Sequence, residues 1–347
     1  MTTKLETKQS QQNEKKTIPT IKVDILTGLR PTNNLTIANY LGAVKPIIDL
    51  QNKNHSALIF IADLHAITDK KPLAVKKIIN SVVADYIALG IDPSKTKIFT
   101  QSAIENEIAI LTIFLSRLIS VAELLRIPTL KEKLKTNAQP ETANTLLLLY
   151  PVMMAADILL QRTKKVPVGK DQLAHLEVSR ELTKRFNKQY KEIFPIPQPL
   201  QIKTLNILSL KGEGKMSKTS PKNAILLTDN VETVAQKIKS AETAFAGIMT
   251  EKLESHILIT KSLCKNNLEQ KEIDVLIEEH MKGKLVMGQF KKIMTRVVQS
   301  FLTEFQTKKV EVMQDPLYIP SILEQGAKIA KKNAQETLRL VKEAMWG

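Results

Sequence analysis

Residues 21 to 100 alternate short apolar runs with amphipathic stretches, and this alternation limits the possible fold more than any other feature of the chain. The run 57–62 (Ala-Leu-Ile-Phe-Ile-Ala) is continuously apolar, as in a parallel strand buried on both faces. Further strands are expected at 21–27 and 97–100, and residues 72–90 follow helical spacing. This strand–helix–strand–helix–strand order predicts an α/β fold with a doubly wound parallel sheet, in which ligands bind outside the carboxyl ends of the strands.

After this region the pattern changes to helices and one more strand. Residues 104–162 turn helical and predict an insertion between elements of the sheet. Residues 165–169 (Lys-Val-Pro-Val-Gly) are typical of another short strand, and a helix is expected over 171–187. Three prolines, at 195, 197 and 199, then predict a loop.

Composition divides the chain into three parts. Residues 1–20 are polar and rich in lysine, glutamine and threonine, which predicts a disordered tail. Residues 21–225 contain the strand–helix pattern and are expected to form the α/β domain. Residues 226–347 show no convincing strand and predict a helical second domain, with helices near 231–241, 266–281, 285–306 and 321–345.

Charge and cysteine content narrow the possible partners and location. A formal net charge of +16 favours a polyanionic partner such as nucleic acid, although a lysine-rich composition alone could produce the same charge. The single cysteine, Cys264, excludes an internal disulfide and a cysteine-based metal cluster. No run approaches the roughly 18 apolar residues that span a bilayer. We therefore expect a cytoplasmic protein without a membrane partner.

The stretch 212–221 (Gly-Glu-Gly-Lys-Met-Ser-Lys-Thr-Ser-Pro), called the lysine loop below, places Lys215 and Lys218 among small residues. Its glycines allow positive φ, and its proline stops a helix from running through. Such a loop can bring two ammonium groups to a triphosphate. Two lysines at this spacing are more often a solvated surface feature, but the full run 215–219 and a second signature upstream favour nucleotide binding.

The upstream signature, residues 27–42, lies between the first predicted strand and the first predicted helix. Free N–H groups and the positive end of a helix attract phosphate at such a position. Asn39 could donate a hydrogen bond to a phosphate oxygen, and Thr36 could cap the helix. Simple capping is the commoner role for an isolated threonine or asparagine there.

Asp157 lies within an apolar run, residues 153–160 (Met-Met-Ala-Ala-Asp-Ile-Leu-Leu). A buried carboxylate is costly unless it is paired. A structural partner such as Arg162 or a backbone N–H would explain it, and a ligand that donates a hydrogen bond is the functional alternative.

Taken together, these motifs resemble the class I aminoacyl-tRNA synthetases. Thr36-Ile-Ala-Asn39 is similar to their His-Ile-Gly-His signature in its Thr-Ile-Gly-Asn form, and Lys215-Met-Ser-Lys-Thr219 is similar to Lys-Met-Ser-Lys-Ser. Within the class, the bacterial tryptophanyl-tRNA synthetase family is the nearest resemblance. It rests on segments 61–68 (Ile-Ala-Asp-Leu-His-Ala-Ile-Thr), 90–93 (Gly-Ile-Asp-Pro), 150–160 (Tyr-Pro-Val-Met-Met-Ala-Ala-Asp-Ile-Leu-Leu) and 166–172 (Val-Pro-Val-Gly-Lys-Asp-Gln).

The resemblance implies a Rossmann-like catalytic domain and the activity of a tryptophan–tRNA ligase. Tryptophan and ATP, used with Mg²⁺, would give tryptophanyl adenylate and pyrophosphate, and tryptophan would then pass to the terminal adenosine of its tRNA. The family also implies a homodimer whose helical domain contacts the tRNA anticodon. A tyrosyl-tRNA synthetase, a plain nucleotidyltransferase and a non-catalytic paralogue that binds tRNA or tryptophan remain open as alternatives.

The resemblance also assigns site residues by position. Catalytic charge compensation falls to Lys215, Lys218 and Lys131, although Lys131 is as readily a surface lysine. ATP contacts fall to Arg30, Pro31, Thr32, Thr36, Ala38, Asn39, Asp171, Met216, Ser217 and the two lysines of the loop. Tryptophan contacts fall to His65, Tyr150, Met154, Asp157 and Gln172, although His65 taken alone favours a satisfied core histidine.

Three positions depart from the family pattern. Ala38 stands where glycine is usual, Arg30 where glutamine is usual, and Lys170 where an acidic residue is common. The first two lie beside the expected ATP site, and the departures favour the non-catalytic alternative. Retention of both loop lysines argues against it.

Overall fold

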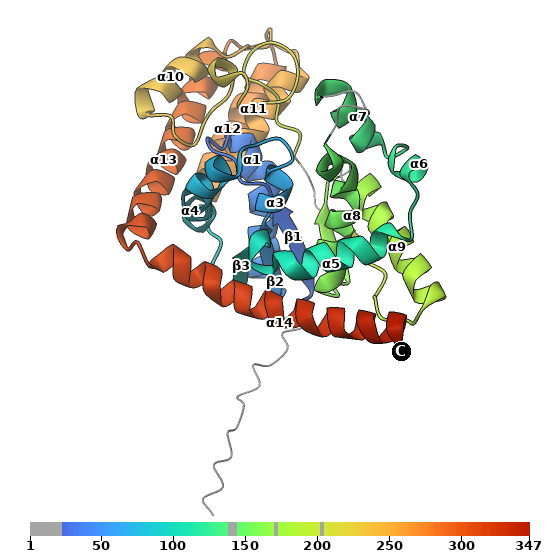
Figure 1. The fold of residues 1–347 in the computed structure, drawn as a ribbon. Coiled ribbons are helices and arrows are strands. Elements are labelled where there is room, and N and C mark those ends of the chain that lie inside the picture. The colour runs from blue at the N-terminus through green and yellow to red at the C-terminus, as the bar shows by residue number, and fades with distance from the viewer. Residues whose placement is uncertain (1–22, 138–143, 170–172, 202–204) are drawn as a thin grey trace, which may run out of the picture.

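A computed structural model describes residues 23–137, 144–169, 173–201 and 205–347. In these ranges, five strands form one parallel sheet in the order β3-β2-β1-β4-β5 (Figure 1). The strands are β1 (Ile25–Leu29), β2 (Ala57–Ile61), β3 (Thr96–Thr100), β4 (Lys165–Val168) and β5 (Gln198–Gln201). The predicted α/β fold with a parallel sheet is confirmed.

Both faces of the sheet are buried, as the continuous apolar run of β2 predicts. Ile59 and Ile61 pack with the helices that follow β1 and β2 and with the C-terminal helices. Leu58 and Phe60, which point the other way, pack with the helices of the insertion. Because successive side chains of a strand point to opposite faces, only a strand covered on both sides can be apolar at every position.

The edge strand β5 corrects the predicted loop at 195–199. Pro199 lies opposite Val166 of β4, inside the strand rather than before it. Proline cannot donate to a ladder and is tolerated where a strand has a neighbour on one side only. The three prolines therefore mark the edge of the sheet.

The helix after β1 is interrupted as it passes the upstream signature. It consists of α1 (Ile37–Asn39), a π-helical turn η1 (Tyr40–Val44) and α2 (Lys45–Asn52), with Pro46 in the first turn of α2. Proline lacks the N–H group that would continue the preceding turn, which accounts for the wider turn before it. Helices α3 (Asp63–Ala66) and α4 (Pro72–Ala88) follow β2, and the predicted helix at 72–90 is confirmed.

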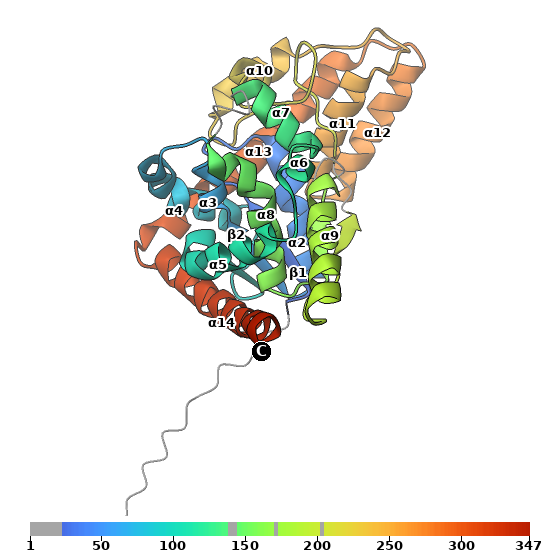
Figure 2. The same ribbon diagram turned by 45° about the vertical axis from the view of Figure 1, so that its right-hand side comes forward.

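The predicted insertion between β3 and β4 is helical. It contains a 3-10 turn η2 (Gln101–Ile104) and the helices α5 (Glu105–Ser116), α6 (Val121–Leu124), α7 (Pro128–Asn137) and α8 (Thr145–Leu160). Helix α9 (Leu173–Gln189) follows β4 and packs against α8. These helices cover the face of the sheet opposite α4 (Figures 1 and 2).

The C-terminal region is helical in the described residues beyond 225, apart from its connections. Its helices are α10 (Val231–Ser240), α11 (Glu251–Leu263), α12 (Asn267–Met281), α13 (Met287–Gln314) and α14 (Tyr318–Trp346). A short 3-10 turn η4 (Pro221–Asn223) precedes them. None of the helices in the described ranges combines the length and the apolar composition needed to cross a membrane.

Helix α14 leaves the other C-terminal helices and runs back across the sheet (Figure 1). It packs against β3, α5 and α8, and Thr337 donates a hydrogen bond of 2.8 Å to the carbonyl of Leu160. It ends at Trp346, which is 75% exposed and lies edge-to-face on Phe114. The proposed division of the chain into two domains at residue 225 stays a prediction. Helix α14 lies beyond this boundary, yet its buried residues pack in the core of the α/β part.

The crossing of α14 over β3 depends on Gly326. A Cβ atom there would lie 2.0 Å from the carbonyl oxygen of Ile98 on β3, and pairing with β2 restrains the backbone of β3 from moving away. We expect Gly326→Ala to lower the free energy of unfolding by about 1–3 kcal/mol, measured in urea. Gly288→Ala, in the first turn of α13 with nothing within 4 Å, is the control and should be neutral or stabilising. Equal stability of the two variants would contradict this packing.

Candidate active site

A cavity of about 650 Å³ opens at the carboxyl ends of β1, β2 and β4, where the sheet topology predicts ligands. Three of the residues assigned to tryptophan line it: His65, Tyr150 and Met154. Arg30, assigned to ATP, also lines it. The rest of the wall is largely apolar and includes Leu26, Phe60, Ile158, Val166, Pro167, Val168 and Leu176. The structure thus brings residues from distant parts of the sequence to one site.

A second cavity, of about 730 Å³, opens at the other end of the sheet. Val23, Asp24 and Lys165, at the amino ends of β1 and β4, are among its lining residues. It contains none of the residues assigned to the site from the sequence. Position in the sheet therefore favours the first cavity as the active site.

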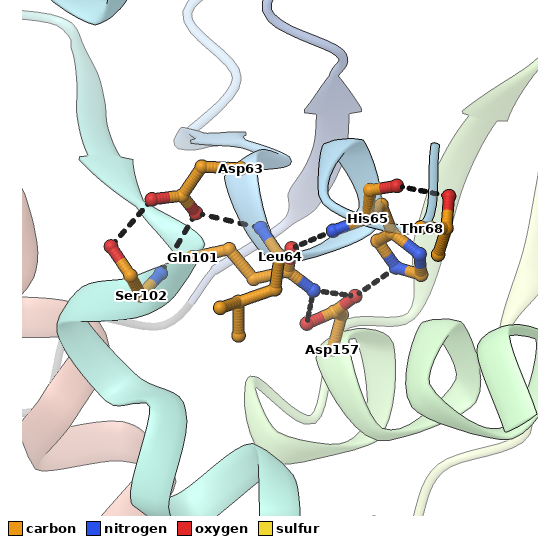
Figure 3. A network of polar contacts seen from close by, with 7 residues as sticks. All are labelled: Asp63, Leu64, His65, Thr68, Gln101, Ser102 and Asp157. Carbon is orange, nitrogen blue, oxygen red and sulfur yellow. Dashed lines mark hydrogen bonds and ion pairs between the residues drawn. The ribbon is translucent and has the colours of Figure 1, made fainter. Parts of the chain in front are cut away.

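Asp157, on α8, is 3% exposed and is held by the side chains of His65 on α3 and Gln101 on η2 (Figure 3). Its Oδ2 lies 2.9 Å from Nε2 of His65, and Nε2 of Gln101 donates to both carboxylate oxygens, at 2.9 and 2.8 Å. Arg162, the structural partner considered from the sequence, pairs with Glu336 instead. His65 is hydrogen-bonded, as expected of a satisfied histidine, but it is half-buried and lines the cavity rather than the core, and its partner is the candidate substrate-binding carboxylate.

Burial decides the protonation behaviour of Asp157. It raises the pKa of the carboxyl group, and the hydrogen bonds from His65 and Gln101 oppose the rise. A carboxylate offers about four acceptor positions, and these contacts use three of them. One acceptor position thus remains on a buried group whose neighbours on α8, Met154 and Ile158, line the cavity.

Gln101 was not singled out from the sequence. Both ends of its amide are hydrogen-bonded, because Oε1 also accepts a hydrogen bond of 3.2 Å from the backbone N–H of His65. The next residue, Ser102, binds Asp63 at the start of α3 (Figure 3). The available signal was its position directly after β3, at the carboxyl edge of the sheet.

Tyr150 closes another side of the cavity. Its hydroxyl donates to Oγ1 of Thr129 at 3.1 Å and lies 3.5 Å from Nε2 of His175. Burial raises the pKa of this phenol, so it stays a neutral donor and acceptor near pH 7. The ammonium group of Lys133 lies 4.1 Å from the centre of its ring, a cation–π contact.

Cations gather around the mouth of the cavity. Burial and then repulsion by Arg30 lower the pKa of Lys133. Lys218 is exposed, yet partial desolvation, followed by repulsion from Lys70 and Arg30, lowers its pKa as well. Arg30 pairs with Asp69, and its buried Nε has no partner among the described residues. Because these positive charges repel one another, an anion placed among them would be stabilised.

The lysine predicted on α7 is not the one that faces the cavity. Lys131 is exposed and is absent from the cavity lining, whereas Lys133, two residues later, lines it. The role assigned to Lys131 stays a prediction. Residues two apart on a helix point in different directions, so Lys131 and Lys133 do not face the same side of α7.

The upstream signature forms a helix cap. Thr36 Oγ1 accepts a hydrogen bond of 3.1 Å from the N–H of Asn39, and Oδ1 of Asn39 accepts one of 2.9 Å from the N–H of Thr36. The capping role of Thr36 is confirmed. Asn39 is exposed and keeps its amide NH₂ group for a further acceptor. Of the other assigned positions, Pro31 is buried, and Thr32 and Ala38 are half-buried.

The two signatures are joined by backbone hydrogen bonds. Ile37 donates to the carbonyl of Ile225 at 3.0 Å, and Leu227 donates to the carbonyl of Leu35 at 2.8 Å. Ile225 follows the lysine loop by only a few residues. The cap of α1 and the base of the lysine loop are therefore parts of one local structure.

The lysine loop itself is a tight hairpin. Gly212 and Gly214 adopt φ values of +76° and +86°, in the left-handed region that glycine tolerates. Met216 is buried and donates to the carbonyl of Ile207 at 2.9 Å. Ser217 lies 2.9 Å from the hydroxyl of Thr219. Buried Met216 fixes the end of the hairpin while Lys215 and Lys218, on either side, stay exposed.

Three of the positions named from the sequence lie outside the described residues: Asp171, assigned to ATP, Gln172, assigned to tryptophan, and Lys170, one of the departures. Their assignments stay predictions. Among the residues that are described, no group of three or more histidine, cysteine, aspartate or glutamate side chains could hold a metal ion.

His256, on α11 behind the lysine loop, is 2% exposed, and its Nε2 has no hydrogen-bond partner among the described residues. Burial, helped by the positive charges of Lys252 and Lys291, lowers the pKa of His256 to about 4. The imidazole is therefore neutral in the folded protein at pH values where a free histidine is charged.

Comparison with known proteins places this site in context. Residues 19–303 match the family described as tRNA synthetases class I (W and Y). The tryptophan–tRNA ligase of Treponema pallidum is 34% identical over 92% of this chain and 96% of its own, and that of Halalkalibacterium halodurans is 37% identical over 94% and 98%. The tryptophanyl-tRNA synthetase of Campylobacter jejuni, solved with ADP and tryptophan, is 32% identical with a TM-score of 0.78 over 92% of this chain and 99% of its own. The enzyme of Mycoplasma pneumoniae is 31% identical with a TM-score of 0.80, over 94% and 98%.

Buried His256 predicts a pH-dependent stability. Below pH 6.5 the unfolded chain binds a proton at this position, whereas the folded chain does so only near pH 4, so stability falls as pH falls through that window. The loss should reach about 3 kcal/mol, and His256→Gln should remove most of it in urea titrations at pH 7, 5.5 and 4.5. His55→Gln, at a half-buried histidine before β2, is the control. An unchanged pH slope in His256→Gln would contradict the prediction.

Proposed function

The chain belongs to the class I tRNA synthetases for tryptophan and tyrosine, and on that premise we propose that it activates tryptophan with ATP and transfers it to tRNA. The observation that carries the proposal is the remaining acceptor position of buried Asp157 beside an apolar cavity. Cations at the mouth of the same cavity suit the phosphates of ATP.

Asp157 would select the amino acid. The apolar wall suits the indole ring, and Asp157 would accept a hydrogen bond from its N–H. Phenylalanine would leave a buried acceptor without its partner, and such a mismatch is rejected strongly. Gln101 and His65 hold the carboxylate in place, so the selectivity depends on a fixed rather than a mobile acceptor. Tyrosine, the alternative substrate, would bring a hydroxyl group that can both donate and accept.

Activation joins the tryptophan carboxylate to the α-phosphorus of ATP. A carboxylate oxygen forms the new bond to phosphorus, and the bond between the α-phosphorus and the oxygen that bridges it to the β-phosphate breaks. Pyrophosphate leaves with the electron pair. The chain supplies no nucleophile of its own, so its contribution is position and charge. Lys215 and Lys218 would stabilise the charge on the departing pyrophosphate, and Lys133 and Arg30 would hold the phosphates at the cavity mouth.

We propose that Mg²⁺ binds to the protein together with ATP, coordinated by the phosphates of the nucleotide. Mg²⁺ in proteins is commonly held by substrate phosphates and only one or two carboxylates. It would neutralise part of the charge that the lysines face. Its binding would therefore be a property of the nucleotide complex.

Transfer would place tryptophan on the 2′-hydroxyl of the terminal adenosine of tRNA. The net charge of +16 supports a polyanionic partner of this kind. We propose that the C-terminal helices contact the anticodon and that two copies of the chain form a homodimer, so that one tRNA spans both. A cytoplasmic location stays a prediction from the sequence.

The tryptophan assignment predicts an asymmetric effect of Asp157→Ala in pyrophosphate exchange. Loss of the acceptor for a buried N–H should cost about 2 kcal/mol, or roughly thirtyfold in tryptophan affinity, and leave the KM for ATP nearly unchanged. Arg162→Ala, whose ion pair with Glu336 lies away from the cavity, is the control and should change neither. Equal loss for both ligands, or a melting temperature lowered without a change in affinity, would show that Asp157 is structural only.

The phosphate assignment predicts that Lys215→Ala and Lys218→Ala each lower kcat of exchange much more than they weaken tryptophan binding. Removing one preorganised charge contact commonly costs about 3 kcal/mol, roughly a hundredfold in rate. The matched control is Lys222→Ala, an exposed lysine just after the loop. If all three variants exchange pyrophosphate at nearly the wild-type rate, the loop lysines do not act on the leaving group.

A further inference from the structure

Two charged side chains from the C-terminal region hold the backbone of Gly212 in the lysine loop. The N–H of Gly212 donates to Oε1 of Glu242 at 2.6 Å, and the carbonyl of Gly212 accepts a hydrogen bond from Nζ of Lys252. Glu242 follows α10, and Lys252 lies in the first turn of α11. Both hydrogen bonds involve an ionised group, which makes them stronger than ordinary backbone contacts.

These contacts fix one of the two glycines of the loop, a residue type whose backbone is intrinsically free. The N–H and the carbonyl of Gly212 belong to the two peptide groups on either side of its Cα atom. Holding both peptide groups fixes φ and ψ of a glycine that lies in the left-handed region, at φ +76°. Lys215 follows three residues later, so the φ and ψ angles of Gly212 influence the direction in which the backbone runs toward Lys215.

Neighbouring contacts extend the same support. Nζ of Lys252 also lies 3.3 Å from Oγ of Ser209, and Oγ of Ser255 accepts a hydrogen bond of 2.8 Å from the N–H of Leu208. The backbone N–H of Glu242 donates to the carbonyl of Leu210 at 2.9 Å. One side of the hairpin is thus attached to α11 and the segment after α10.

Glu242 and Lys252 are not an ion pair with each other. The ion pairs found among the described residues do not join them, and the polar group between them is the backbone of Gly212. A backbone has a fixed polarity, because its N–H can only donate and its carbonyl can only accept. The arrangement therefore requires an acceptor at 242 and a donor at 252, and the two cannot be exchanged.

We propose that Glu242 and Lys252 are positioning residues that hold the lysine loop in the conformation that presents Lys215 and Lys218 to the phosphates of ATP. The inference rests on the proposed function of that loop. Neither side chain needs to touch ATP. Their effect would appear as a better-placed charge in the transition state, where a displacement of about 1 Å can cost a hundredfold in rate.

The requirement for fixed polarity gives a sharp test in pyrophosphate exchange. Glu242→Gln and Lys252→Arg keep an acceptor and a donor, so they should stay within about twofold of the wild type, whereas Glu242→Lys and Lys252→Glu should each lower kcat/KM for ATP at least tenfold. The KM for tryptophan should stay unchanged. The double variant E242K/K252E should not recover, because each charge would then face the wrong end of the Gly212 backbone.

Controls separate this effect from net charge and from folding. Glu254→Lys changes the charge on the same helix at an exposed side chain that forms no hydrogen bond or ion pair with the described residues, and it should be silent. Glu242→Ala and Lys252→Ala remove each contact without introducing repulsion and should give the same defect as the reversals, in milder form. Melting temperatures are compared throughout.

A readout independent of activity distinguishes failure of the inference from failure of the proposed function. Trypsin cleavage after Lys211, Lys215 and Lys218, followed by mass spectrometry, should be faster in the single reversals and in the double variant than in the wild type. If the wild type shows no tryptophan-dependent exchange, the proposed function fails and this assay alone judges the loop contact. Recovery in E242K/K252E would show an ordinary ion pair, and unchanged cleavage with unchanged exchange in the single reversals would overturn the inference.

Discussion

The hydrogen bonds to Asp157 are the interaction on which the candidate active site depends. A carboxylate inside an apolar helix is unfavourable unless donors surround it, and here the donors come from α3 and from the turn after β3. Hydrogen bonding to this one buried carboxylate therefore holds α8, α3 and η2 in fixed positions relative to one another. The same contacts fix the carboxylate beside the cavity that Met154 and Ile158 line, so the hydrogen bonds that stabilise the site would also set its proposed selectivity.

The sheet supplies the frame in which this interaction is possible. The carboxyl ends of the parallel strands lie at one edge of the sheet. Helix α14 packs closely on β3, where Gly326 contacts the backbone of Ile98. The cap at Thr36 and the base of the lysine loop share backbone hydrogen bonds. The cavity, the helix cap and the loop are consequently parts of one continuous structure rather than three separate binding elements.

The sequence predicted what local patterns encode and missed what distant contacts decide. The apolar run of β2 and the helical spacing of 72–90 were sufficient for the sheet and its crossover helix, whereas the prolines between 195 and 199 concealed the edge strand β5. The motifs located Asp157 and the lysine loop, but Gln101 has no motif. Glu242 and Lys252 contact a residue 30 and 40 positions away, and no local pattern records such a pair.

Trp346 has a consequence for the spectroscopy of the protein. It is the only tryptophan among the 347 residues, it is mostly exposed, and it lies edge-to-face on Phe114 of α5. The indole fluorescence of these residues therefore reports on the end of α14 and its contact with α5. Trp346 is not among the residues that line the cavity proposed to hold the substrate, so this signal originates outside that cavity.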